Sequence, residues 1–268
     1  MWLLLRIIRV CALAWLAWAT LLFVSQRALM YPGANLHAPA IALPPAAERI
    51  VLQSAGMPGH AILLRADTTG RSPAILFAHG NAEFAAQNAA AFQPWADAGL
   101  HVLLVEYPGY DGAPGAPTQA SIDALWITAY DWLASRPDVD PSRIIGFGRS
   151  LGSGPTSMLS SRRPLAAVVL QSPFASTARF AHERGLPGFL VRDRWDNAAA
   201  LRSFGGPVFV SHGRHDTIIR PSHAVAIAGA PNVELEWLEC GHNDCPWFET
   251  AYRDRVLGFI AAKGVLAD

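Results

Sequence analysis

At 268 residues, the chain has the length of one α/β domain with an added segment. Hydrophobic residues make up 51% of it and charged residues 16%, a composition that excludes a disordered chain. The formal net charge is zero and no basic run exceeds the pair Arg162-Arg163, so nucleic acid is not an expected partner.

The N-terminal segment explains much of the apolar excess. Arg6 and Arg9 are followed by an uncharged stretch from Val10 to Val24. If the two arginines extend toward lipid headgroups, the apolar segment is long enough to cross a bilayer. No small-x-small cleavage site follows Val24. We therefore expect residues 1–24 to form an uncleaved signal anchor, rather than a cleaved signal peptide or a buried helix.

The charges beside this anchor and the composition after it give two further expectations. Two arginines precede the apolar stretch and Arg27 follows it, which favours a cytoplasmic N-terminus and a catalytic domain on the periplasmic or another non-cytoplasmic side. Residues 25–48 are rich in Pro and Ala and are typical of an extended juxtamembrane linker.

From residue 49 to 268, short apolar runs alternate with helical stretches, which predicts crossover units in a single α/β domain. We expect eight strands, at 49–53, 60–65, 73–79, 101–106, 143–148, 165–171, 207–212 and 233–239. The first two are joined by SAGMPG and are expected to form an antiparallel hairpin; the others predict a mostly parallel sheet flanked by helices. Residues 172–203 are too long for a simple connection, so we expect a short lid insertion there.

Polar residues with catalytic potential follow several of these strands. Ser150, Asp216 and His242 occur in that chain order, each in a loop after an apolar run. In an open α/β sheet such loops meet at one edge, where ligands bind. A serine hydroxyl needs a base within hydrogen-bond reach to become a nucleophile, and a carboxylate orients the histidine that supplies it.

The sequence around the serine, GFGRSLGSG, fits a nucleophile elbow between a strand and a helix. Gly148 and Gly152 supply the space that such a tight turn requires. The backbone N–H of Leu151 would face a developing oxyanion, and the N–H of Asn81, after the third strand, would be the second donor. The simpler alternative is an ordinary strand–helix turn whose Ser150 hydroxyl caps the helix.

The motifs FAHGNAE, EYPGYDG, GFGRSLGSG, HGRHDTII and GHND resemble those of the α/β-hydrolases, above all the single-pass, membrane-anchored α/β-hydrolase-domain proteins. That group includes protein depalmitoylases and aminopeptidase-like members. The resemblance implies Ser150 as nucleophile, Asp216 as acid, His242 as base, and Asn81 with Leu151 as oxyanion donors. The sequence departs from the group at 108–111, where Pro-Gly-Tyr-Asp replaces Arg-Gly-Tyr-Gly.

Other titratable residues near these motifs have weaker claims to catalysis. We expect His79 to steady the oxyanion loop, and His215 to be a solvated neighbour of the acid. His212 precedes the acid, where no base is expected. Asp244 and Glu106 are candidates for groups that support the site from behind, Asp244 as a loop-fixing side chain.

Two cysteines flank the candidate base. Cys240, His242 and Cys245 include zinc-type ligands, but no fourth ligand accompanies them, so we expect neither a metal nor an organic cofactor. A disulfide between the cysteines would stiffen the histidine loop, although the short span is demanding for disulfide geometry. Reduced, partly buried thiols are the default expectation.

Together these features predict a membrane-anchored serine hydrolase that cleaves carboxylic ester or thioester bonds through an acyl-enzyme. The candidate substrate-binding residues are Tyr110, Phe174 and Phe180, the two phenylalanines lying in the lid. The lid's apolar residues either simply pack it onto the domain or form an acyl-binding wall. We expect a small-molecule acyl ester, a thioester or a lipidated substrate, with no expectation for oligomeric state.

Two alternatives remain beside this function. The first is a serine peptidase of the aminopeptidase-like kind on the same three residues; Glu106, Glu183 and Asp193 would then be the candidate anchors for a peptide terminus. The second is a non-catalytic, membrane-anchored binding protein, which would have no physical need for all three catalytic groups.

Overall fold

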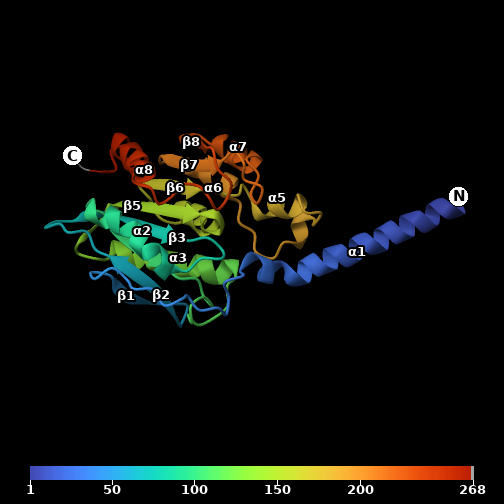
Figure 1. Cartoon of the computed structure of the whole chain (residues 1–268), viewed down its shortest axis with the longest axis horizontal. Coiled ribbons are helices and arrows are strands. Elements are labelled where there is room, and N and C mark those ends of the chain that lie inside the picture. Colours follow the sequence, from blue (N-terminus) through green and yellow to red (C-terminus); the bar gives the residue numbers. More distant parts are fainter. Residues whose placement is uncertain (267–268) are drawn as a thin grey trace.

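A central sheet of eight strands forms the body of the protein in a computed structural model that describes residues 1–266 (Figure 1). The strands are β1 (Glu48–Ser54), β2 (Met57–Leu64), β3 (Ser72–Ala78), β4 (His101–Val105), β5 (Val139–Arg149), β6 (Ala167–Gln171), β7 (Val208–Gly213) and β8 (Val233–Leu238). Their order is β1-β2-β4-β3-β5-β6-β7-β8. β2 is antiparallel to β1 and β4, and all other neighbours are parallel. The predicted edge hairpin and mostly parallel sheet are confirmed.

Helices cover both faces of this sheet. They are α2 (Ala85–Asp97), α3 (Gln119–Ala134), α4 (Ser153–Ser160), α6 (Asn197–Ser203), α7 (Ser222–Ala228) and α8 (Thr250–Ala262). α3, α4, α6 and α7 pack into one apolar cluster and α2 and α8 into another. Along β3, Ala74 and Leu76 enter the first cluster, whereas Ile75 and Phe77 enter the second. Strands buried on both faces explain why the apolar runs are continuous.

Helix α1 (Trp2–Met30) leaves this body as a single rod whose free end is the N-terminus (Figure 1). It is long and apolar enough to cross a membrane. The helix continues beyond Val24 through residues 25–30, which we had assigned to an extended linker. No helix breaker occurs before Pro32, so the hydrogen-bonded turns continue until the chain reaches Pro32 and Gly33.

The rest of the predicted linker is bound to the domain. The N–H of Asn35 donates to the Gly109 carbonyl (2.7 Å), and the N–H of Ala38 donates to Asp111 Oδ1 (2.9 Å). In return, the Asp111 N–H donates to the Leu36 carbonyl (2.9 Å). Asp111 therefore holds the chain that leads from α1 to the sheet.

The segment 172–203, the lid, contains α5 (Thr177–His182), a short 3-10 helix η2 (Gly188–Leu190) and α6. An isolated antiparallel bridge joins Ser176 to Asp196, so the residues between them leave the sheet and return close to where they left it. In Figure 1, α5 lies beside the C-terminal part of α1. The lid and α1 thus meet at the same edge of the body.

Candidate active site

Ser150 lies at the tip of a tight turn between β5 and α4. Its backbone has φ of +51°, a left-handed conformation that a non-glycine residue adopts at some energetic cost. A Cβ at Gly148 would overlap the Gly152 carbonyl oxygen, and one at Gly152 would overlap the Ala78 carbonyl of β3. The two glycines are therefore required by close backbone contacts, and the turn has the geometry of a nucleophile elbow.

The structure brings Ser150, His242 and Asp216 into one hydrogen-bonded chain. His242 Nε2 lies 2.9 Å from Ser150 Oγ, and His242 Nδ1 lies 2.6 Å from Asp216 Oδ2. Asp216 follows β7 and His242 follows β8, so adjacent parallel strands deliver the acid and the histidine to the same edge. This arrangement can draw a proton from the serine hydroxyl while the carboxylate orients the imidazole.

Asp216 is held as a carboxylate by its own surroundings. Its Oδ1 accepts the N–H groups of Ile218 (2.9 Å) and Ile219 (2.8 Å), which leaves Oδ2 for His242. Burial opposes the charge, but the hydrogen bond and charge of His242 and the Ile219 N–H outweigh it, so the pKa of Asp216 lies below its ordinary value. The acid is thus ionised at neutral pH.

The other titratable residues near the candidate acid and base do not take part in this hydrogen-bonded chain. Buried His212 donates through Nε2 to the Ile219 carbonyl (2.8 Å), and its burial lowers its pKa. His215 is exposed and lies beside Glu239 on the surface. Asp244 Oδ1 accepts the N–H of Gly241 (2.6 Å) and so fixes the turn that carries the candidate base. None of the three contacts Ser150.

The loop that carries Asn81 is fixed by a buried polar network. His79 Nε2 lies 2.9 Å from Glu106 Oε1, and Glu106 Oε2 accepts the Ala85 N–H (2.9 Å). The Tyr107 hydroxyl donates to the His79 carbonyl (2.7 Å) and the Tyr110 hydroxyl to the Asn81 carbonyl (2.8 Å). Tyr110 is fully buried and does not line the pocket. The prediction of Tyr110 as a substrate-binding residue is wrong, because its side chain supports the loop from behind.

Comparisons with known proteins identify relatives of this chain. An uncharacterized protein of Mycobacterium tuberculosis strain H37Rv is 34% identical over 268 residues, which cover 96% of this chain and 95% of that protein. Alpha/beta hydrolase domain-containing protein 17B of Xenopus laevis is 31% identical over 197 residues, 70% of this chain and 66% of that protein. The chain belongs to the α/β-hydrolases.

Solved structures support the fold of this α/β-hydrolase. An esterase of Pyrococcus furiosus has a TM-score of 0.70 at 16% identity, covering 87% of this chain and 98% of its own. Esterase 2 of Thermogutta terrifontis has a TM-score of 0.66 at 19% identity, covering 84% and 97%. At these identities the likeness establishes the architecture alone. No protein-family model matches the chain.

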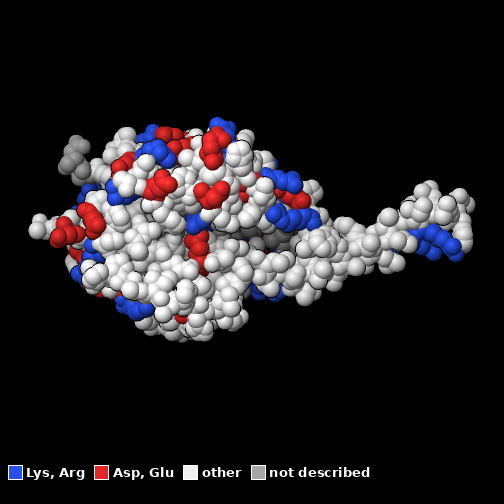
Figure 2. All heavy atoms as spheres, viewed as in Figure 1, with Lys and Arg blue, Asp and Glu red and all other residues white. Residues whose placement is uncertain are grey.

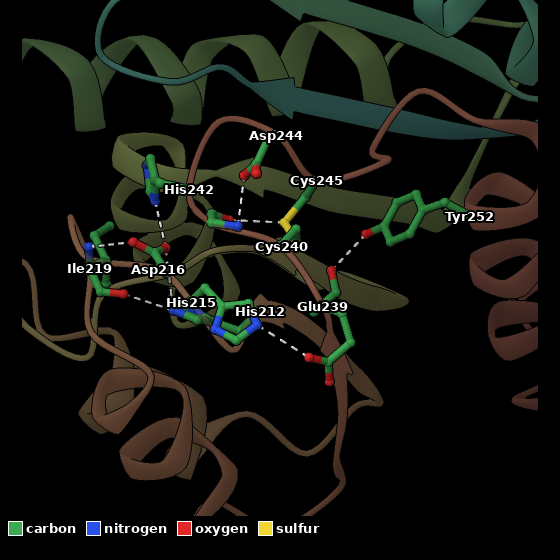
Figure 3. Close-up of a disulfide and its surroundings, with 12 residues drawn as sticks. His212, His215, Asp216, Ile219, Glu239, Cys240, His242, Asp244, Cys245 and Tyr252 are labelled. Atoms are coloured by element: carbon green, nitrogen blue, oxygen red, sulfur yellow. Dashed lines mark hydrogen bonds and ion pairs between the residues drawn. A yellow bond between two sulfur atoms is a disulfide. The ribbon is translucent and has the colours of Figure 1, made fainter.

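The loop after β8 of this hydrolase is closed by a disulfide between Cys240 and Cys245 (Figure 3). The default expectation of reduced thiols is therefore wrong. The turn fixed by Asp244 brings the two Cα atoms within 5.1 Å, inside the range that a disulfide accepts. Since the sulfurs are joined to each other, they are not available as zinc ligands, and the bridge encloses His242.

We expect reduction of this disulfide to lower both stability and activity. Opening a loop of this length restores chain entropy to the unfolded state worth about 2 kcal/mol, and it frees the backbone on both sides of His242. The check is thermal unfolding and ester turnover of the full chain with and without dithiothreitol, beside the double variant Cys240→Ser/Cys245→Ser. The double variant should be insensitive to the reductant. A reduced wild type with unchanged unfolding temperature and unchanged turnover would contradict this role.

A pocket of about 660 Å³ opens over the serine, and Figure 2 shows a hollow where α1 meets the body. Ser150, His242, Asn81 and Leu151 all line it, as do the predicted lid residues Phe174 and Phe180. The apolar residues among its other walls are Leu22, Leu29, Met30, Ala82, Ala181, Leu186, Val191, Ile218 and Ile219.

Sequence reasoning missed the contribution of α1 to this pocket. Leu22 lies in the stretch Val10–Val24, which is apolar on every side apart from Thr20, and Leu29 and Met30 follow it in the same helix. Hydrophobic periodicity therefore carries no signal that separates a pocket-lining side from a lipid-facing one. Gln26, in the predicted linker, also lines the pocket and bonds to the lid, accepting the Arg192 N–H at 2.7 Å.

Proposed function

We propose that this α/β-hydrolase is a membrane-anchored serine hydrolase that cleaves carboxylic ester or thioester bonds of long-chain acyl substrates. The observation that carries the proposal is the hydrogen-bonded chain of Ser150, His242 and Asp216 at the base of a largely apolar pocket. The hydrogen-bonded chain supports hydrolysis by a serine, and the apolar walls support an acyl substrate.

In the proposed reaction, Ser150 Oγ attacks the acyl carbon while His242 Nε2 takes the hydroxyl proton. His242 returns that proton to the leaving alcohol or thiol, which departs and leaves an acyl-enzyme. A water molecule, activated by the same imidazole, then releases the carboxylic acid and regenerates the serine. Asp216 stays ionised throughout and stabilises the imidazolium that forms in each half of the cycle.

The oxyanion would be held by the backbone N–H groups of Leu151 and Asn81, two residues that line the pocket. Within residues 1–266, the Asn81 N–H donates to no protein oxygen, whereas its carbonyl is held by the Tyr110 hydroxyl. A donor that is fixed in place but unsatisfied is suited to an oxygen supplied by the substrate. The buried His79–Glu106 pair adds stiffness behind this loop.

The membrane placement in this proposal rests on α1 and on the disulfide. The helix is long and apolar enough to span a bilayer. A disulfide next to the site is suited to an oxidising compartment, which agrees with a catalytic domain on the non-cytoplasmic side. The arginines near the free end of the helix agree with a cytoplasmic N-terminus.

The peptidase alternative lacks a free anchor for a peptide terminus. Glu106 is buried against His79, and Asp193 forms a bidentate pair with Arg27. Glu183 lies beside His223 and Arg179. Among the described pocket-lining residues Glu83 is the only acid, and it pairs with Arg149 at 2.6 Å. With these carboxylates occupied, an ester or thioester is the better match to the site.

The test is a series of p-nitrophenyl esters of increasing chain length, from acetate to palmitate, beside acyl-thioesters and an aminoacyl-nitroanilide. We expect kcat/KM to rise with chain length, with esters and thioesters cleaved and the anilide resistant. An optimum at acetate would count against acyl substrates. Wild-type protein that is folded but neither turns over any substrate nor reacts with a serine-directed fluorophosphonate would support the non-catalytic alternative.

A further inference from the structure

The C-terminal part of α1 is docked firmly on the lid. Arg27 forms a bidentate pair with the buried carboxylate of Asp193, with N–O distances of 2.9 and 3.0 Å. Gln26 bonds to the lid backbone through both of its amide atoms, to Leu190 and Arg192. Near the other end of this contact, Trp18 Nε1 donates to the Arg184 carbonyl (3.1 Å). These bonds fix α1 against the lid from Trp18 to Arg27.

Apolar contacts fill the space between these hydrogen bonds. Ala19 of α1 is buried against Leu186 and Val191 of the lid, and Leu22 packs against the same cluster. Residues 2–17, in contrast, are exposed along their whole length. The helix therefore has two parts, a free N-terminal part and a docked C-terminal part that is built into the hydrolase.

The length of the free part sets the position of the lid relative to a bilayer. Sixteen helical residues span about 24 Å, less than the hydrocarbon core of about 30 Å. If α1 crosses the bilayer, the turn at Trp18 to Leu22 must lie within or at the boundary of the hydrocarbon. The lid that touches this turn then lies at the membrane surface. Its exposed Phe189, with the exposed Arg192 and Arg194 nearby, suits such an interface.

The pocket over Ser150 extends to the part of α1 that would lie at the membrane surface. Leu22, Leu29 and Met30 form its wall on the α1 side, while Ser150 and His242 lie in the same pocket. From Leu22 to Met30 the helix rises about 12 Å, so the pocket follows α1 for roughly two turns toward the bilayer. Phe180, Leu186 and Val191 of the lid continue the apolar lining beside α1.

We propose that α1 is a wall of the acyl-binding site as well as an anchor, and that the pocket opens toward the bilayer along the pocket-lining side of α1, beside its closed contact with the lid. A substrate embedded in the membrane would pass its acyl chain along Leu22 and Leu29 to Ser150 without leaving the hydrocarbon. This inference rests on the proposed function and goes beyond it, since it assigns substrate selection to residues of the membrane helix. It requires an acyl chain anchored in the outer leaflet.

The test compares Leu22→Trp with Val24→Trp in the full chain, reconstituted in phosphatidylcholine vesicles. Leu22 lines the pocket, whereas Val24 lies on the same helix, is 71% exposed and does not line it. The measurement is kcat/KM for a vesicle-embedded p-nitrophenyl palmitate relative to that for soluble p-nitrophenyl butyrate. We expect this ratio to fall at least tenfold in Leu22→Trp and to stay within twofold in Val24→Trp.

Both esters are measured on the same preparation of each variant. A loss of folded protein therefore lowers both values equally and leaves their ratio unchanged. An unchanged ratio in Leu22→Trp, or an equal fall in Val24→Trp, overturns the inference while the proposed hydrolase function stands if butyrate is still cleaved. Wild-type protein that cleaves neither ester and does not react with a fluorophosphonate overturns both.

A second measurement follows the acyl chain without any variant. A long-chain alkyl fluorophosphonate with a diazirine near the end of its chain would attach to Ser150, losing fluoride, and would crosslink on illumination. We expect crosslinked peptides from residues 18–30 of α1. Crosslinks confined to the body of the hydrolase, with none on α1, would contradict the opening toward the bilayer.

Discussion

Replacing Ser150 by alanine is expected to lower kcat for ester hydrolysis by about 10⁴-fold or more, with no loss of folded protein. The substitution removes the only atom that forms the acyl-enzyme bond, so neither His242 nor the oxyanion donors can compensate. Alanine fits the same turn, since the backbone φ of +51° costs it no more than it costs serine. The measurements are butyrate turnover and fluorophosphonate labelling.

Ser161→Ala is a matched control for this experiment. Ser161 lies just after α4, the helix that Ser150 introduces, and it is exposed. The same chemical change there should leave turnover within twofold and labelling complete. Retention of more than a few per cent of activity by folded Ser150→Ala would remove the serine from the mechanism.

Asp216→Asn is expected to lower kcat by about 10³- to 10⁴-fold with only a small change in KM. In the native site Oδ1 accepts two backbone N–H groups and Oδ2 accepts the imidazole Nδ1–H, so both oxygens are needed as acceptors. An amide has one acceptor and one donor group. If its NH₂ faces His242, the imidazole is driven to the tautomer that cannot accept the serine proton.

Asp244→Asn provides the matched control for the acid. Its Oδ1 accepts a single N–H, from Gly241, and an asparagine oxygen can do the same. We expect that variant to keep turnover within about threefold. Equal losses in the two variants would mean that the carboxylates act only by holding the histidine loop, and a mild effect of Asp216→Asn would remove the acid from the proposed mechanism.

Wild type and Asp216→Asn are expected to differ in the pH dependence of their stability. The pKa of Asp216 is lower in the folded chain than its ordinary value, so its ionised form stabilises the fold at pH values above that ordinary value. This contribution is lost as the pH falls through the folded-state pKa. Unfolding temperatures measured from pH 7 down to pH 3 should therefore fall more steeply for wild type than for Asp216→Asn.

Local sequence signals predicted most of the architecture. The apolar runs at β3, β5 and β6 are continuous because these strands are buried on both faces. Such runs can be recognised from side-chain type alone, without knowing which helices cover the strands. Gly148 and Gly152 indicated the elbow because the turn admits no side chain on either side of Ser150. The chain order of Ser150, Asp216 and His242, each after an apolar run, placed them at the same edge of the predicted sheet, and the structure brings them within hydrogen-bond distance.

Other features depended on contacts between distant segments. Tyr110 was predicted to bind substrate, and only the position of the Asn81 carbonyl beside its hydroxyl shows that it supports a loop instead. The state of Cys240 and Cys245 depended on the turn that Asp244 fixes between them. Neither the role of Tyr110 nor the redox state of the two cysteines can be predicted from composition or periodicity.

By itself, then, the sequence determined the strands, the elbow, the identity of the three polar groups in the site and the presence of an apolar N-terminal helix. The tertiary structure alone decided that this helix is a wall of the pocket. The apolar stretch Val10–Val24 is equally compatible with lipid on every side, and contacts with the lid, among them the Arg27–Asp193 pair and the packing on Ala19, select the side of α1 that faces Ser150.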